Sequence, residues 1–360
     1  MNMARSTTTA SSKLYDALIL GAGPAGLSTA LSLCRVKHTS AIFSTASFRN
    51  DPAFRAHTVL SRDDQPAADI RRFGRLDIEK YGDAHFVERG AASAQRATIS
   101  SSTGDVSGFE VTDASGEVWR GRKLVLAMGS KDIYPDIPGY DHCWGNTIYQ
   151  CLFCDGRERS HTPAAILSFD HPMQLHYVST MLQMGVPEIH VLGNGPIDVQ
   201  DEGIAQALQS AKALGCKVDE RKIAKLTPIP GEGHEGAADV VFEDGGKLRV
   251  GFIAHRAATT VSAPEIVKGL GVEVVSDPFG NDLIKREEPF GKTNIDGVFA
   301  CGDAGTMIKQ FTFAMAHGAA AGAGVHFALS QERQAAVTEK SKDLKPEYVK
   351  QMGMPAILAK

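Results

Sequence analysis

The sequence predicts an α/β protein made of two three-layer, Rossmann-like domains, the second inserted into the first. Three observations lead to this fold class. Residues 15–20 read as a buried strand that runs into a glycine-rich turn and then into an amphipathic helix, which is how a βαβ unit begins. Two further patterns of a strand followed by a turn occur at residues 164–172 and 188–198. Far downstream, residues 298–301 form a short apolar strand that ends in Gly302-Asp303.

The composition is typical of a globular protein that handles small molecules. The chain has 360 residues, 43% of them hydrophobic, which allows a substantial core and suggests two domains. Its 38 basic and 42 acidic residues give a net charge of -4, which argues against nucleic acid and membrane partners. We expect neither a secretory signal in residues 1–13 nor a membrane span in residues 311–329. Six scattered cysteines point to a reducing compartment, so we expect a cytoplasmic protein.

The glycine-rich turn fits the dinucleotide-binding pattern G-x-G-x-x-G. The first glycine allows a tight turn, the second lets a pyrophosphate approach the backbone, and the third lets the helix pack closely, with its positive end at the phosphates. The candidate binding residues are Gly21, Gly23, Pro24, Ala25 and Gly26. The next strand, residues 40–43, ends in Ser44 where an acid normally holds the ribose, so Ser44 is the candidate for that contact. The alternative is a glycine turn that binds no ligand.

Two later segments resemble the remaining motifs of flavoproteins with two dinucleotide-binding domains. Residues 124–129 resemble the strand that closes the first part of a FAD domain, with Ala127 and Gly129 as candidate contacts. Residues 293–303 resemble the second flavin motif, whose aspartate, here Asp303, binds the ribityl chain. Three motifs in this order imply FAD as the cofactor and a FAD-binding domain that is split by an insertion.

A C-x-x-C pair, Cys151 and Cys154, lies inside the insertion. With it, the chain resembles low-molecular-weight thioredoxin reductases over residues 14–330. Within that fold it is similar to the fungal dithiol oxidases of epidithiodiketopiperazine biosynthesis, of the gliotoxin and aspirochlorine type. The closer similarity rests on C-L-F-C and on the segment 48–58, which adds Arg49, Asn50 and His57 as candidate flavin-binding residues.

The resemblance implies a fold of the thioredoxin reductase type with four parts. The FAD-binding domain comprises residues 14–137 and 255–330, the inserted lobe with the cysteines comprises residues 138–254, and residues 331–360 form a C-terminal tail. It also implies a homodimer with FAD in each subunit.

The sequence of the inserted lobe distinguishes a reductase from an oxidase. A thioredoxin reductase carries there a second glycine motif for NADPH, followed by arginines for the 2′-phosphate. In this chain the strand 164–168 runs into F-D-H-P-M-Q without a glycine, and no arginine occurs between Arg159 and Arg221. A pyrophosphate would meet side chains and a carboxylate, and lysine is a poorer bidentate phosphate ligand. The sequence therefore predicts that the lobe binds no NADPH and that electrons enter through the cysteines.

The residues around the pair suggest a mechanism. A C-x-x-C pair can close a small disulfide and lower the pKa of one thiol, which suits thiol exchange. The resemblance implies that Cys151 exchanges with the substrate and that Cys154 lies beside the flavin. Asp155 matches a general acid or base of the reductases, and Gln310 matches a glutamine near the flavin ring, with a surface glutamine as the alternative. His317 is a further candidate base and is equally well read as a structural helix histidine.

Zinc is the alternative ligand for the cysteine pair. It would need a second Cys/His pair at motif spacing, and the sequence has none, so we expect no metal.

Three functions are compatible with these motifs. The first is a FAD-dependent thiol oxidase that forms an intramolecular disulfide in a small dithiol metabolite, with O2 as the acceptor and H2O2 as the product. The second is an NADPH-dependent disulfide reductase of the thioredoxin type. The third is a redox-inactive flavin-binding regulator. Dithiol oxidation is argued from the motifs, whereas the epidithiodiketopiperazine class rests on the resemblance alone.

Overall fold

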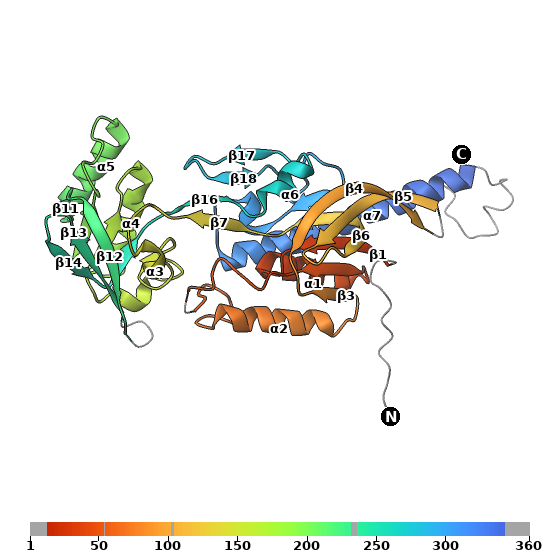
Figure 1. Ribbon diagram of the computed structural model, residues 1–360, viewed down its shortest axis with the longest axis horizontal. Helices are drawn as coiled ribbons and strands as arrows, with labels where there is room; N and C mark the ends of the chain where they lie inside the picture. The colour runs from red at the N-terminus through yellow and green to blue at the C-terminus, as the bar shows by residue number, and fades with distance from the viewer. Residues whose placement is uncertain (1–12, 54, 102–103, 232–235, 343–360) are drawn as a thin grey trace, which may run out of the picture.

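The computed structural model describes residues 13–53, 55–101, 104–231 and 236–342, so residues 343–360 of the expected tail lie outside the described residues. Figure 1 shows a large lobe and a smaller lobe joined by two extended segments, β7 (Ser130–Ile133) and β16 (Ala258–Val261). These two strands pair antiparallel, so the chain enters and leaves the smaller lobe along one two-stranded ribbon. The α/β fold class expected from the sequence is confirmed.

The large lobe is built on a seven-stranded sheet in the order β3-β2-β1-β6-β5-β4, with β19 paired to β6. Strands β3, β2, β1, β6 and β19 run parallel to one another, whereas β4 and β5 continue the sheet as an antiparallel meander. The strands are β1 (Leu14–Leu20), β2 (Ser40–Phe43), β3 (Ala84–Val87), β4 (Ala91–Ser101), β5 (Gly104–Asp113), β6 (Val118–Leu126) and β19 (Val298–Ala300).

Strand β1 is apolar along its length because both faces of the sheet are covered. Ala17 and Ile19 pack under the helices α1 (Pro24–Arg35), α2 (Ala67–Glu79) and α7 (Phe311–Lys342). Leu18 and Leu20 face the opposite layer, which contains Trp119, α6 (Pro264–Gly269) and the hairpin of β17 (Val274–Ser276) and β18 (Asp282–Ile284). The large lobe therefore has three layers.

The smaller lobe has the same layered plan. Its central sheet is parallel, in the order β11-β10-β9-β15-β8. Helices α4 (Leu175–Gln183) and α5 (Glu202–Ala213) cover one face, and the antiparallel sheet β12-β13-β14 covers the other together with α3 (Tyr140–Cys143). The strands are β8 (Ile148–Tyr149), β9 (Ala164–Leu167), β10 (Ile189–Leu192), β11 (Lys217–Asp219), β12 (Ile223–Ile229), β13 (Ala237–Phe242), β14 (Lys247–Val250) and β15 (Phe252–Ala254).

The topology brings the sequence motifs to one edge of the large sheet. The glycine turn follows β1, Ala127 follows β6, and Asp303 follows β19, and these three strands are parallel neighbours. Ligands of such sheets bind outside the carboxyl ends of the strands. Ribbon strand β7 starts at the same edge and leads into the smaller lobe.

Candidate active site

One cavity joins the glycine turn to the cysteine pair. Its volume is about 730 Å³, which lies in the range of small-molecule and cofactor sites. Residues of the glycine turn line one part of it, and Cys151, Cys154 and Asp155 line another. We call this space the flavin cavity.

The glycine turn fits a FAD pyrophosphate. Gly21 has a φ of +113°, and a Cβ there would lie 2.3 Å from the carbonyl oxygen of Ala127. A Cβ on Gly26 would lie 1.8 Å from the carbonyl oxygen of Gly21, so helix α1 packs directly on the turn. Among the described residues no side chain caps α1 at its N-cap, Gly23, so the backbone N–H groups of its first turn can meet an anion.

Ser44, the candidate for the ribose contact, directly follows β2. Its hydroxyl oxygen accepts a hydrogen bond from the Ala46 backbone N–H at 3.1 Å, and its residue lines the flavin cavity. Because a hydroxyl both accepts and donates, the Ser44 O–H can still donate to a ribose oxygen. The donor set at this end of the cavity therefore suits the dinucleotide.

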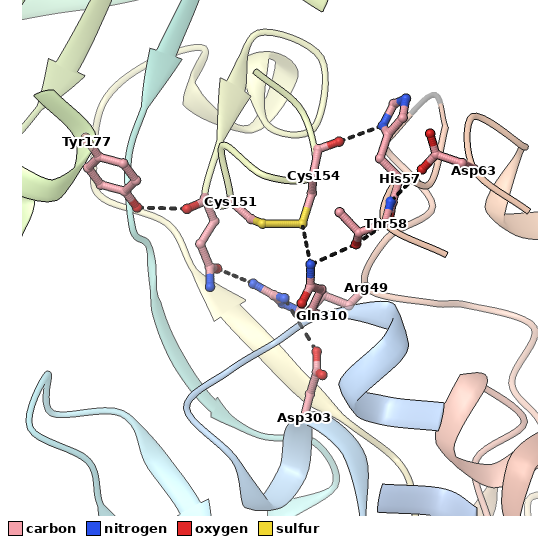
Figure 2. The surroundings of a disulfide bond; sticks show 10 residues. Arg49, His57, Thr58, Asp63, Cys151, Cys154, Tyr177, Asp303 and Gln310 are labelled. Atoms are coloured by element: carbon pink, nitrogen blue, oxygen red, sulfur yellow. Dashed lines mark hydrogen bonds and ion pairs between the residues drawn. A yellow bond between two sulfur atoms is a disulfide. The ribbon is translucent and has the colours of Figure 1, made fainter. Parts of the chain in front are cut away.

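The two cysteines form a disulfide that separates two cavities. Cys151 and Cys154 are bonded, with their Cα atoms 5.2 Å apart. Cys154 lines the flavin cavity, whereas Cys151 also lines a second cavity of about 950 Å³ on the side of the smaller lobe. Figure 2 shows the disulfide between Tyr177 on one side and Gln310 and Asp303 on the other. The bond is thus accessible to two different ligands.

Arg49 ties the disulfide segment to the large lobe. Its guanidinium pairs with both carboxylate oxygens of Asp132 on β7 at 2.7 to 3.0 Å, and Asp132 is only 5% exposed. The same group donates to the side-chain oxygen of Gln150, which precedes Cys151, and lies 3.5 Å from Asp303. One arginine therefore connects both lobes and the ribbon.

Cys154 is held by residues of the large lobe. The Gln310 amide nitrogen lies 4.0 Å from the Cys154 Sγ and donates to the Thr58 hydroxyl at 2.8 Å. Because a carbonyl oxygen only accepts, the His57 Nδ1, 2.6 Å from the Cys154 carbonyl, carries the hydrogen. The other ring nitrogen of His57 lies 3.5 Å from a carboxylate oxygen of Glu158. These contacts fix the Cys154 side of the disulfide (Figure 2).

Asp155 has a perturbed carboxyl group. Burial raises the pKa of Asp155 to about 7, and nearby Glu158 adds to this effect while His57 opposes it. A group with that pKa can accept and return protons near neutral pH, which is what thiol chemistry requires. The residue lines the flavin cavity beside Cys154.

Side chains bond the backbone donors of the turn that would hold an NADPH pyrophosphate. At the end of β9, the Gln174 side-chain oxygen accepts from the backbone N–H groups of Asp170 and His171, at 2.8 and 3.2 Å. The His171 Nδ1 accepts from the Met173 N–H at 3.1 Å and completes a capping box. The donors that a pyrophosphate would need are therefore already bonded, in contrast to those of α1.

The next turn, after β10, is also unsuited to a phosphate. A Glu220 carboxylate oxygen accepts from the Ile197 N–H at 2.8 Å and so brings negative charge into the turn. The nearest arginine in the sequence, Arg221, pairs with Asp219 and Asp244 at 2.7 and 3.1 Å. The prediction from the missing glycines thus has a structural basis.

The structure brings most of the sequence-derived site residues together. The flavin cavity is lined by Gly21, Gly23, Pro24, Ala25, Ser44, Arg49, Asn50, His57, Ala127, Gly129, Cys151, Cys154, Asp155, Asp303 and Gln310. Gly26 lies behind this surface and supports the turn.

His317 is the exception. It lines neither cavity, and its Nε2 accepts from the Arg286 guanidinium at 3.2 Å. Burial and Arg286 lower the pKa of His317. Within one subunit it therefore does not face the disulfide, and the structural reading of this histidine describes its position.

Sequence reasoning missed the residues that support the disulfide and line the second cavity. Asp132 and Gln150 hold Arg49, and Tyr177 donates from its hydroxyl to the Gln150 carbonyl at 2.8 Å. Phe153 lines the second cavity. The sequence showed two large apolar residues inside the C-x-x-C turn, Leu152 and Phe153, but not that Phe153 would be the exposed one.

Two further findings concern other kinds of site. Within the described ranges, no group of three or more His, Cys, Asp or Glu side chains is arranged to hold a metal ion. In the same ranges, no helix is long and apolar enough to cross a membrane.

Comparisons with known proteins agree with the fold. A family model described as pyridine nucleotide-disulphide oxidoreductase matches residues 15–219. The chain is 36% identical over 324 residues to thioredoxin reductase sirT of Leptosphaeria maculans, covering 87% of this chain and 94% of that protein. It is 33% identical to thioredoxin reductase aclD of Aspergillus oryzae, covering 89% and 98%. Among solved structures, an oxidoreductase from Agrobacterium tumefaciens is 27% identical and superposes with a TM-score of 0.76, covering 88% and 99%.

Proposed function

The chain belongs to the pyridine nucleotide-disulphide oxidoreductase family, whose members bind FAD, and from that premise we propose that it is a FAD-dependent thiol oxidase. It forms an intramolecular disulfide in a small dithiol metabolite, with O2 as the electron acceptor and H2O2 as the product. We further propose that the metabolite is of the epidithiodiketopiperazine class, as the resemblance of the C-L-F-C segment implies.

One observation carries the proposal: the disulfide lies between the flavin cavity and a second cavity, and of the two cysteines only Cys151 lines both. A dithiol in the second cavity reaches Cys151, while Cys154 stays on the flavin side. This arrangement lets electrons pass from one ligand to the other through sulfur.

The bonded backbone donors of the coenzyme turn support the oxidative direction. A reductase needs NADPH to reduce its flavin, and here Gln174 and His171 occupy the backbone donors that its pyrophosphate would use. Electrons then enter by way of a thiol. The opposite direction remains a second candidate because the relatives sirT and aclD are named thioredoxin reductases.

The reaction on this chain's residues is a pair of thiol exchanges. A substrate thiolate attacks the Cys151 sulfur, the protein disulfide breaks, and Cys154 leaves as a thiolate. The second substrate thiolate attacks the substrate sulfur of the mixed disulfide, so the substrate disulfide forms and Cys151 is released. Asp155 accepts a thiol proton, since its pKa is about 7.

The final transfer restores the protein disulfide. When bound, FAD would supply the two-electron acceptor for this dithiol, and O2 would be the final oxidant, with H2O2 as the product. The Cys154 thiolate, beside Gln310, gives up the pair as it bonds again to Cys151, and the thiol protons end in the peroxide. The resting state is the disulfide that the structure contains.

We also propose a homodimer. Phe313 and Phe327 on α7 are 40% and 50% exposed, and since they lie 14 residues or about four helical turns apart they share one side of the helix, which suits contact with a second copy. Sedimentation of the purified protein at micromolar concentration tests it, and a monomer contradicts it.

An anaerobic titration of the flavin-loaded protein tests the function. We expect NADPH to leave the flavin absorbance unchanged, and a dithiol to bleach it with a stoichiometry of one dithiol per flavin. Admission of O2 then restores the colour and releases peroxide. Rapid bleaching by NADPH refutes the oxidase in favour of the reductase, and steady turnover by Cys154→Ser refutes any redox role of the pair.

A further inference from the structure

Large apolar side chains gather, exposed, around the second cavity. Such residues are normally scattered singly over a protein surface, and a concentration of them beside a cavity marks a contact site. Those that both line this cavity and are at least 40% exposed are Ile133, Tyr134, Phe153, Met173, Met307 and Ile308. They come from the ribbon, the disulfide turn, the turn before α4 and the loop before α7. We call them the apolar wall.

Phe153 lies nearest to the chemistry. Of the two residues between the cysteines, Leu152 is buried at 5% exposure in the core of the smaller lobe, whereas Phe153 is 67% exposed. The Phe153 ring lies almost parallel to the His176 ring of α4, with an interplanar angle of 14° and centroids 6.3 Å apart. The disulfide turn therefore presents a flat aromatic surface to the cavity that Cys151 lines.

Polar side chains of the same cavity have partners within the protein. Gln174 and His171 cap the turn before α4, and the His255 Nδ1 lies 2.7 Å from the Tyr140 hydroxyl. Burial lowers the pKa of His255 to about 4, so this imidazole is neutral. Arg256 stacks on Phe279 at 3.7 Å and lies 3.7 Å from Asp277, and its Nη2 has no hydrogen-bond partner among the described residues. The surface left for a ligand is accordingly mainly apolar and aromatic.

From this geometry we infer that the apolar wall selects dithiols carried on a flat aromatic or apolar body, with Phe153 as the residue that determines this specificity. The inference deepens the proposed oxidase function and rests on it for the identity of the reacting groups. The second cavity is concave and of small-molecule size, about 950 Å³. A folded protein partner instead needs an extended face of about 800 Å². The shape favours the small ligand.

Two dithiols of contrasting bodies test the inference. The aromatic probe is ortho-benzenedimethanethiol and the polar probe is dithiothreitol, with oxygen consumption measured on the flavin-loaded enzyme. We expect Phe153→Ala to lower kcat/KM for the aromatic probe by about tenfold, mainly by raising KM. The kcat/KM for dithiothreitol should change by less than about twofold. Phe153→Tyr keeps the ring and should retain the preference.

Leu214→Ala is the matched control, because Leu214 is 48% exposed at the end of α5 and lines neither cavity. It should leave kcat/KM unchanged for both dithiols. Equal losses on both dithiols with Phe153→Ala, or no loss on either, overturn the inference. The inference is also overturned if the enzyme oxidises reduced thioredoxin faster than either dithiol and Phe153→Ala suppresses that reaction. The apolar wall would then bind a protein.

A binding measurement separates this inference from the proposed function. Ortho-benzenedimethanol has the same body without thiols, and a ligand-observed NMR titration of the oxidised protein reports its affinity. If no dithiol drives oxygen consumption, the proposed oxidase function is wrong. The titration still tests whether the apolar wall binds an aromatic body. Binding that weakens in Phe153→Ala and not in Leu214→Ala supports the wall, and unchanged binding in both refutes it.

Discussion

Replacing Asp155 by asparagine should remove one component of the pH dependence of stability. The carboxyl is uncharged in the folded protein up to a pKa of about 7, because burial disfavours its ionised form, whereas in the unfolded chain its pKa is near 3.8. Between these values the folded state binds more protons than the unfolded state, so stability decreases as pH rises from about 4 to about 7. Asparagine has the same shape and does not titrate.

The magnitude follows from linkage. Each pH unit between the two pKa values changes the free energy of unfolding by about 1.4 kcal/mol, so from pH 5 to pH 8 the contribution of Asp155 declines by about 3 kcal/mol, the change ending at about pH 7. We therefore compare the free energy of unfolding of Asp155→Asn with that of the wild type at each pH. The difference, variant minus wild type, should be about 3 kcal/mol larger at pH 8 than at pH 5.

Urea unfolding followed by circular dichroism at the two pH values measures this difference. Groups that titrate identically in both proteins cancel when the variant is compared with the wild type. The control is Asp141→Asn, the same chemical change at a side chain that is 61% exposed and outside the site. A difference between Asp155→Asn and wild type that is the same at pH 5 and pH 8 refutes the burial argument and removes Asp155 as the proton acceptor.

Three other variants have expected outcomes. Cys154→Ser should lower dithiol oxidation by at least about a thousandfold, because no protein disulfide can form. Its free Cys151 thiolate should still attack an added linear aromatic disulfide, giving a mixed disulfide visible by mass spectrometry and one released thiol; an unmodified Cys151 contradicts its role as the exchange thiol. Gly26→Ala places a Cβ 1.8 Å from the Gly21 carbonyl oxygen, so the purified variant should lack the flavin absorbance, and normal yellow protein would show that the turn is not the FAD site. Arg49→Met leaves Asp132 buried and unpaired, which should lower the free energy of unfolding by about 3 kcal/mol in a thermal unfolding experiment. The control Arg249→Met removes an exposed ion pair and should lower it by less than about 1 kcal/mol; equal losses contradict this reasoning.

Several parts of the fold and site were predictable because their chemistry is local. Gly21 needs a positive φ for the turn between β1 and α1, and the four neighbouring residues suffice to recognise it. The C-x-x-C spacing places two sulfurs within bonding reach without any help from the rest of the chain. The apolar run of β1 indicates a strand buried on both faces, which is confirmed.

Other parts were not predictable, because they depend on contacts across the chain. Arg49 pairs with Asp132, which is 83 positions away, and nothing in either neighbourhood marks the partner. His317 looked equally suited to catalysis and to packing until α7 was seen to place it beside Arg286. The raised pKa of Asp155 likewise needs the surrounding residues that exclude water.

The sequence by itself determined that the lobe carrying the cysteines lacks a second glycine motif, since a missing residue type is visible without coordinates. Only the tertiary structure decided what stands there instead. Gln174 and His171 bond the free backbone donors, and the disulfide comes to lie between two cavities, with Cys151 as the one of its two cysteines that lines both. The physical reason is that backbone hydrogen bonds and cavities belong to groups brought together by folding, and their order along the chain does not record which groups will meet.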